Sequence, residues 1–362
     1  MKNALTFPVI ALALSLAQTS HAAVKKAVFV MTNAAHENEI LSYSVQADGS
    51  LKAYSTYRTG GRGSGGTVDP LGSQGSLTLS EDHSLLFAVN AGSGQISSFR
   101  VDGPKLELAD VKPTGGAAPV AVAEHGGWLY VLNFAGNSDV VGFRVDDGSL
   151  IKIANSERFL TTANSGASSL AFTPDGKFLL VTEKLTNNID AFPVNSDGTL
   201  GTVVTTKDPA AGLFDLMITP DGTVLSLEAG NASVTPFQVG PTGALTSLAA
   251  PVPTKDAASC WIVSTPDGRF VYVANTVSST ISGYRYSGGT LTPIGSTVVA
   301  TFPAGSVDLD LAVSGDGKYL YSTNAGAGTI GMLAIKADGT LKLIGTLPAL
   351  GAEVGQNGIA AL

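Results

Sequence analysis

Cysteine, charge and histidine are all scarce in this 362-residue chain, and the shortages exclude several classes of protein. The one cysteine, Cys260, rules out a disulfide scaffold within the chain. Charged residues make up 14% of the sequence and hydrophobic residues 44%, the reverse of the balance in a disordered chain. The net charge of -8 neither neutralises nucleic-acid phosphates nor attracts an anionic membrane. We expect a monomer that takes a small-molecule ligand, with no nucleic-acid partner and no membrane insertion.

The first 22 residues have the pattern of a secretory signal peptide. Lys2 supplies the positive charge, residues 4–17 form an uncharged apolar run, and Ser20-His21-Ala22 places small residues around a cleavage site. The apolar run is too short for a transmembrane helix. The sequence thus predicts a signal peptide over 1–22, cleavage after Ala22 and a periplasmic or secreted protein; an uncleaved anchor is the alternative.

Helical periodicity is absent too, and the remaining chain reads as one repeated unit of four short strands. In residues 169–204, Asp175-Gly176 separates the first strand from the second, and Asp197-Gly198 separates the third from the fourth. Such turns recur at a period of about 45 to 50 residues, which is typical of a β-propeller. The pattern begins on a second strand, Ala27 to Asn33, and leaves a spare strand at Asn357 to Leu362. We therefore predict an all-β, single-domain, seven-bladed propeller over 23–362, closed by the C-terminal strand in the first blade.

The ends of the second strands suggest where a site could lie. Seven residues stand at these ends: Asn33, Asn90, Asn133, Glu183, Glu228, Asn275 and Asn324. An Asn amide is suited to closing the turn that follows, so the two glutamates depart from the repeat. Asp215 and Asp310 begin innermost strands, and Val120 and Trp261 hold the same place in other blades. Antiparallel pairing brings both sets of positions to one mouth of the channel.

The sequence therefore predicts a cluster of four acids, Glu183, Asp215, Glu228 and Asp310, at this mouth. Crowded carboxylates either raise a pKa, which suits acid–base catalysis, or recruit a divalent cation. The alternative is that each acid only accepts hydrogen bonds from loops. In that case Asn should replace either glutamate with no loss of stability.

Other polar residues on the same face are candidate substrate-binding groups. Lys184 and Arg62 could hold an anion, Trp261 offers a stacking face, Gln74 lies in the long connection over 59–75, and His36 lies in the turn after Asn33. That connection could be a lid or simply a surface loop. The sequence has no Gly-x-Ser-x-Gly elbow, no zinc-type Cys/His spacing and no phosphate-binding loop motif.

Several segments resemble one known family. FVYVANTVSSTISGY at 270–284 and LLFAVNAGSGQISSF at 85–99 are similar to repeats of the lactonase family of seven-bladed propellers, which includes 6-phosphogluconolactonases and carboxymuconate cyclases. LGSQG at 71–75, VTEKL at 181–185 and CWIV at 260–263 resemble an exported bacterial branch of it. The resemblance implies a propeller that acts on, or binds, a small lactone or carboxylate at the channel mouth.

The chain departs from that family where its chemistry lies. Lactonising members carry a Gly-Pro-Arg-His run that here reads Gly166-Ala167-Ser168-Ser169, without Arg or His. Two functions remain open at this point. One is an exported lactonase-like enzyme that uses the four acids. The other is a non-catalytic periplasmic or secreted propeller that binds a ligand or a protein partner.

Overall fold

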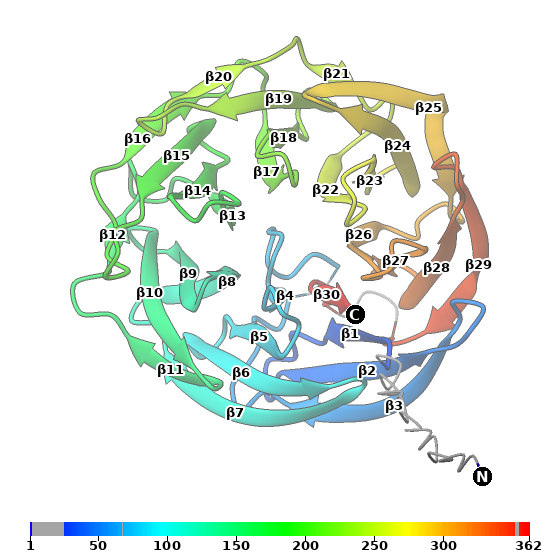
Figure 1. Ribbon diagram of the computed structural model, residues 1–362, viewed down its shortest axis with the longest axis horizontal. Helices are drawn as coiled ribbons and strands as arrows, with labels where there is room; N and C mark the ends of the chain where they lie inside the picture. Colours follow the sequence, from blue (N-terminus) through cyan, green and yellow to red (C-terminus); the bar gives the residue numbers. More distant parts are fainter. Residues whose placement is uncertain (2–24, 67, 352–354) are drawn as a thin grey trace.

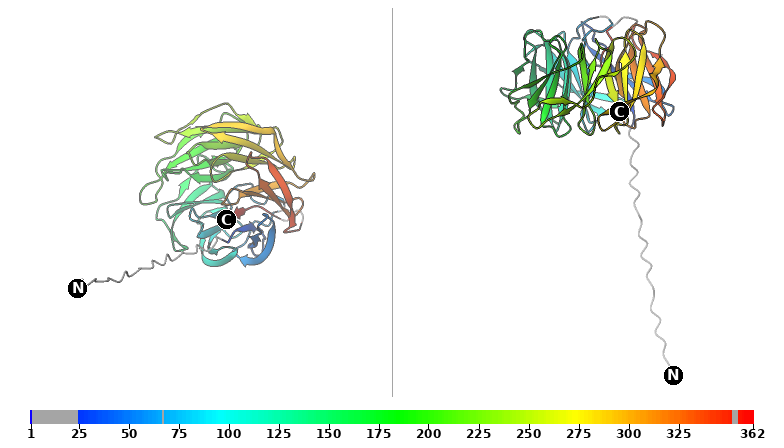
Figure 2. Two further views of the ribbon diagram at one scale, coloured as in Figure 1. Left: turned by 45° about the vertical axis from the view of Figure 1, so that its right-hand side comes forward. Right: turned by 90° about the horizontal axis from the view of Figure 1, so that it is seen from above.

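The computed structural model describes residues 1, 25–66, 68–351 and 355–362, and they form a seven-bladed β-propeller (Figure 1). Seen edge-on, the ring is a flattened disc (Figure 2). No helix occurs in these described residues, so none there is long and apolar enough to cross a membrane. The predicted signal peptide lies outside the described residues apart from Met1.

Each blade is an antiparallel sheet whose first-named strand lines the central channel. Blades 1 to 3 comprise, from the channel outward, β30 (Ile359–Ala361), β1 (Ala27–Met31), β2 (Glu39–Val45) and β3 (Leu51–Arg58); β4 (Leu77–Leu79), β5 (Leu85–Asn90), β6 (Gln95–Asp102) and β7 (Lys105–Pro113); and β8 (Ala117–His125), β9 (Trp128–Ala135), β10 (Asp139–Asp146) and β11 (Ser149–Lys152) with β12 (Arg158–Phe159).

The remaining blades follow the same order. Blades 4 to 7 comprise β13 (Ala167–Phe172), β14 (Phe178–Glu183), β15 (Asn188–Pro193) and β16 (Val204–Lys207); β17 (Leu213–Ile218), β18 (Val224–Glu228), β19 (Ser233–Val239) and β20 (Leu245–Ser247) with β21 (Val252–Pro253); β22 (Ser259–Ser264), β23 (Phe270–Asn275), β24 (Thr280–Ser287) and β25 (Thr290–Thr301); and β26 (Asp308–Val313), β27 (Tyr319–Asn324), β28 (Thr329–Ile335) and β29 (Leu341–Pro348).

The two ends of the ordered ring meet in blade 1, as predicted. Strand β30 pairs antiparallel with β1, with Phe29 opposite Ala360. The Asn33 side-chain amide donates to the carbonyl of Asn357 at 2.7 Å and to that of Gly355 at 3.1 Å. This pairing leaves no free strand edge at the junction of the termini, which is how a propeller protects its sheets from further strand addition.

Burial falls from the inside of a blade to the outside. All six residues of β5 are buried, whereas β3 exposes most of its eight residues. Large apolar side chains of neighbouring blades pack face to face, for example Phe29, Phe87 and Phe143 of blades 1, 2 and 3. Removing this apolar surface from water is the main stabilising term, about 25 cal/mol for each Å² buried.

One sequence-based alignment is wrong by a residue. In blade 3 the first two strands are joined by a two-residue turn, Gly126-Gly127, between the paired residues His125 and Trp128. Blades 2 and 4 to 7 have longer turns at this place. Counting back from the turn therefore placed Val120 at the channel, where the register places Ala121 opposite Leu132.

Candidate functional site

Residues 69–75, which we call the channel segment, lie outside the repeat and cross the mouth of the central channel. The mouth is the end of the channel at which the second strand of each blade finishes. In Figure 1 the channel segment is the light-blue stretch that leads into β4 and reaches the middle of the ring. The Ser73 hydroxyl donates to the carbonyl of Val120 in blade 3 at 2.8 Å. The Gln74 amide group donates to the Ile262 carbonyl and accepts from the Ile262 N–H in blade 6, at 2.8 and 2.9 Å. This part of the long connection is therefore bound to the ring rather than lying loose on its surface.

Trp261, one of the predicted binding residues, holds this channel segment. Its indole N–H donates to the Ser73 carbonyl at 3.0 Å, and its ring meets that of Phe214 edge to face at 5.2 Å. The side chain is almost completely buried. Trp261 and Gln74, two predicted binding residues, thus both make internal contacts that hold the channel segment to the ring.

Lys184 lies half-buried beside the channel segment. Its ammonium donates to the Gly72 carbonyl at 2.6 Å, and it lies 4.8 Å from the ring centre of Phe214 and 6.0 Å from that of Phe134. Burial lowers the pKa of Lys184, against the opposing effect of the Asp69 charge. A cation between two aromatic faces and a carbonyl is well stabilised despite its loss of water.

Asp69 is a functional candidate that the sequence analysis did not identify. Its Oδ1 accepts from the Gly72 N–H at 2.8 Å and from the Asn357 side-chain amide at 3.0 Å. A Cβ placed on Gly72 would lie 3.2 Å from the Lys184 ammonium and 3.9 Å from the other Asp69 oxygen, Oδ2. The two charges therefore lie around this one glycine. Because the segment belongs to no repeat, comparison of the blades gave no signal for Asp69.

Asp215 and Asp310, two of the four predicted acids, lie deeper, on the innermost strands of blades 5 and 7. Asp215 Oδ1 accepts from the Leu216 N–H at 2.7 Å, while its Oδ2 is buried with no partner among the described residues. Burial raises the pKa of Asp215 well above its ordinary value, and the charge of Asp310 adds to the effect. Asp310 accepts from the N–H groups of Leu311 and Ile359, and burial raises its pKa to about 7. These two acids do influence each other.

Glu183 lies instead at the junction between blades 3 and 4. Its carboxylate accepts from the Thr161 N–H at 2.9 Å, the Thr161 hydroxyl at 2.6 Å, the Thr186 hydroxyl and, at 3.2 Å, the Asn188 amide. Thr161 follows the last strand of blade 3, so the glutamate ties that connection to blade 4.

Glu228 occupies the equivalent place between blades 4 and 5. Its two oxygens accept from the hydroxyls of Ser226 and Ser233, at 2.5 and 2.6 Å. The buried carboxyl of Asp208 lies beside it. Burial, with the charge of Asp208 adding to it, raises the pKa of Glu228 to about 7. Within the described residues, no hydrogen bond joins either glutamate to Asp215 or Asp310, so these contacts do not gather the four acids into one cluster.

Arg62 and His36 are both exposed. The Arg62 guanidinium donates to the Gly92 carbonyl in the adjacent blade 2 turn at 3.4 Å. Over the described ranges, neither residue makes a hydrogen bond or ion pair with Lys184 or Asp69. In the same part of the chain, no group of three or more His, Cys, Asp or Glu side chains is arranged to hold a metal ion.

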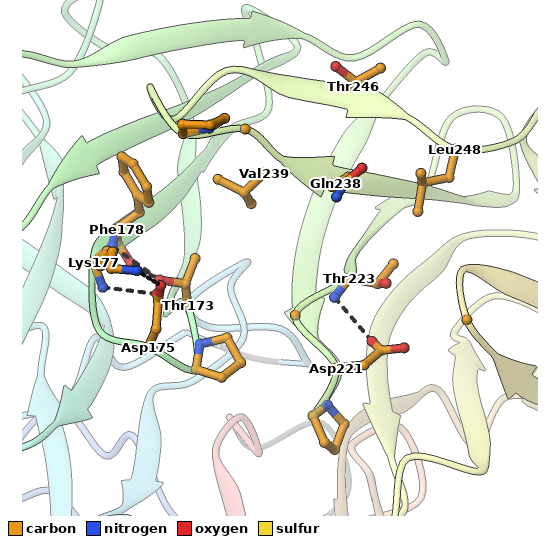
Figure 3. Close-up of a pocket in the computed structure, with 16 residues that line it drawn as sticks. Thr173, Asp175, Lys177, Phe178, Asp221, Thr223, Gln238, Val239, Thr246 and Leu248 are labelled. Atoms are coloured by element: carbon orange, nitrogen blue, oxygen red, sulfur yellow. Dashed lines mark hydrogen bonds and ion pairs between the residues drawn. The ribbon is translucent and has the colours of Figure 1, made fainter.

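A surface groove of about 920 Å³ lies on the opposite face, between blades 4 and 5 (Figure 3). Its charged side chains have partners within the protein: Asp175 pairs with Lys177 at 2.7 Å, and Asp221 accepts from the Thr223 N–H at 3.2 Å and from the Tyr286 hydroxyl at 2.8 Å. None of the predicted site residues lines it. The mouth crossed by the channel segment therefore remains the candidate site.

Seven antiparallel blades around a central channel define a closed seven-bladed β-propeller. A family described as "Lactonase, 7-bladed beta-propeller" matches residues 16–259 and 215–353. The chain belongs to this family.

Individual relatives are distant. The chain is 23% identical to a 6-phosphogluconolactonase of Pectobacterium atrosepticum over 274 residues, covering 73% of this chain and 81% of that protein. It is similar in fold to a periplasmic gluconolactonase of Pseudomonas aeruginosa, with a TM-score of 0.72, 18% identity and coverage of 93% and 99%. A Lactobacillus plantarum protein has a TM-score of 0.74 at 18% identity, with the same coverage. At these identities the solved structures establish the fold alone.

Proposed function

We propose that this protein is an exported lactonase-like enzyme that hydrolyses a small cyclic ester at the channel mouth. The observation that carries the proposal is the placement of Asp69 and Lys184 around Gly72, in a chain of the lactonase family. A carboxylate and an ammonium around one glycine are the two groups that ester hydrolysis by water requires: a base and a cation for the developing oxyanion.

The chemistry assigns one role to each group. Asp69 takes a proton from a water molecule as its oxygen attacks the lactone carbonyl, and Lys184 stabilises the negative charge that forms on the carbonyl oxygen. The ring C–O bond then breaks, and the leaving alkoxide receives the proton from Asp69, giving an open hydroxy acid. The Gly72 N–H and the Asn357 amide hold Asp69 Oδ1, which leaves Oδ2 to act as the base.

The buried acids are less suited to this role. Burial raises the pKa of Asp215 well above its ordinary value, which disfavours the ionised form that a general base needs. Glu183 already accepts four hydrogen bonds. In this proposal the buried acids stabilise the fold, and Asp69 is the catalytic base.

Turnover of a lactone panel by purified protein tests the proposal. We expect Asp69→Asn to lower kcat by about 100-fold or more, because Asn keeps the Gly72 contact but cannot take a proton. Lys184→Met should lower it comparably. The matched control is Asp102→Asn, which replaces an exposed acid paired with Lys25 at the surface, and it should retain the parent rate.

Wild-type protein that folds but opens no lactone would overturn the enzymatic proposal and favour the non-catalytic alternative, a propeller that binds a ligand or protein partner. If the Asp69→Asn variant kept full activity, Asp69 would not be the base. Export is tested separately by cell fractionation and by sequencing the mature N-terminus, which we expect at Ala23.

A further inference from the structure

We propose, resting on the lactonase function above, that the ligand is a lactone with an apolar substituent, an alkyl or aryl group that lies on Phe134 and Leu185. The apolar character of the mouth is the first reason. Phe134 is 40% exposed and Leu185 is 77% exposed, although both are large apolar side chains. Such side chains exposed together at a ligand site indicate an apolar partner.

These side chains adjoin the proposed reacting groups. The phenyl rings of Phe134 and Phe214 lie on Lys184, at 6.0 and 4.8 Å from its ammonium. Leu185 follows Lys184 and packs near Gly166, where an added Cβ would come within 2.9 Å of the Leu185 side chain. A lactone whose carbonyl meets Lys184 would thus have its substituent beside these apolar surfaces.

The mouth continues into a larger apolar cluster. Ala229 and Cys260 are partly buried hydrophobic residues that pack against the cluster containing Phe214 and Trp261. Burial raises the pKa of the Cys260 thiol to about 12, which keeps it an uncharged, apolar neighbour. An apolar substituent that covers the surface next to Lys184 would therefore make the free energy of binding more favourable.

The charges at the mouth disfavour a strongly anionic ligand. Phosphate groups are commonly held by several cations or by a bidentate Arg. Lys184 already donates to the Gly72 carbonyl, and Asp69 lies on the other side of that glycine. One partly desolvated ammonium beside a carboxylate suits a neutral ester better than a phosphorylated sugar lactone.

The test is a series of δ-lactones with alkyl chains of increasing length on the ring, from δ-valerolactone to δ-decalactone. We expect kcat/KM to rise about twofold to fourfold for each methylene that becomes buried. Glucono-δ-lactone and its 6-phosphate should be poorer substrates than δ-decalactone. Leu185→Ala should lower kcat/KM for δ-decalactone several-fold more than for δ-valerolactone. The matched control Leu343→Ala, 46% exposed on the outer strand β29, should change neither.

Calorimetry with the corresponding δ-lactams, which resist hydrolysis, separates this inference from the proposed function. Turnover without chain-length dependence in either assay overturns the apolar ligand class and leaves the lactonase function standing. Lactam binding that tightens with chain length, without turnover of any lactone, supports the ligand class and overturns the lactonase function. If the protein neither hydrolyses any lactone nor binds the lactams, both the apolar ligand class and the lactonase function are overturned.

Discussion

Glu183 and Glu228 occupy equivalent places in adjacent blades, yet their surroundings differ. Glu183 accepts only from N–H and O–H donors, two of them on Thr161 of the preceding connection. At Glu228 the preceding connection instead provides Asp208, a second buried carboxyl group. Glu183 also has a buried acid beside it, Asp190 of its own blade, whose pKa is raised to about 7 by burial and by the charge of Glu183. The difference is that four hydrogen bonds stabilise the Glu183 carboxylate, whereas two stabilise that of Glu228. Identical residues at identical repeat positions can thus differ in how well their neighbours stabilise the charge.

The asparagine junctions show why the difference arises. Asn90 Oδ1 accepts from the Thr59 hydroxyl and the Asn38 amide, at 2.6 and 3.1 Å, while its own amide donates to Ser97 at 2.7 Å. An amide can both donate and accept, so one residue suits varied neighbours. A carboxylate can only accept, and its stability depends on the donors and acids that its own blade and the preceding connection place around it.

The largest effect is expected where an asparagine junction also closes the ring. Truncation after Gly355 removes β30, deprives Asn33 of the Asn357 carbonyl and exposes the edge of β1. We expect loss of cooperative thermal unfolding and of solubility, measured by calorimetry and sedimentation. A synthetic peptide covering residues 356–362 should partly restore both. A truncated chain that melts like the full chain would mean that β30 is not needed for closure.

The next effect separates the two glutamates. Glu183→Asn shortens the side chain and leaves donors of Thr161 and Thr186 without an acceptor, so we expect a loss of about 2–3 kcal/mol in the free energy of unfolding. Comparison of the repeats alone predicts the opposite, because Asn is the usual residue at this position and should replace Glu183 with no loss of stability. Urea denaturation of Glu183→Asn and Glu228→Asn measures the difference. Equal losses in the two variants would contradict the comparison.

The smallest effect is a change in pH dependence. The folded state raises the pKa of Glu228 from 4.5 to about 7, so it holds a proton that the unfolded chain releases. Stability from this group is present below about pH 4.5 and falls as the pH rises to about 7. Glu228→Gln removes that fall, so the variant should match the parent near pH 4.5 and exceed it at pH 8 by about 1–3 kcal/mol.

Thermal melts from pH 4.5 to 8 measure this gain. The control is Asp102→Asn, which replaces an exposed acid paired with Lys25 at the surface and should follow the parent curve. If the melting temperatures of Glu228→Gln and the parent changed in parallel across the whole pH range, the raised pKa of Glu228 beside Asp208 would be contradicted.

Much of the fold could be predicted because the signals are local. Turn residues such as Asp175-Gly176 act within one hairpin, and seven repeats confirm one another. The prediction was wrong by one residue at Val120, where the Gly126-Gly127 turn is shorter than its counterparts. The position of Asp69 could not be predicted, because its connection has no counterpart in other blades.

The sequence by itself determined the seven blades, their order and the closure by the final strand, because hairpin turns and alternating burial act over a few residues and recur. Only the tertiary structure decided which polar groups meet. It brought Asp69 near Lys184 and Gln74 to Ile262, residues far apart in the chain, and it placed Asp208 beside Glu228 at the junction of two adjacent blades. The physical reason is that hydrogen bonds and charge interactions act over a few ångströms, and those separations exist only after the ring has closed.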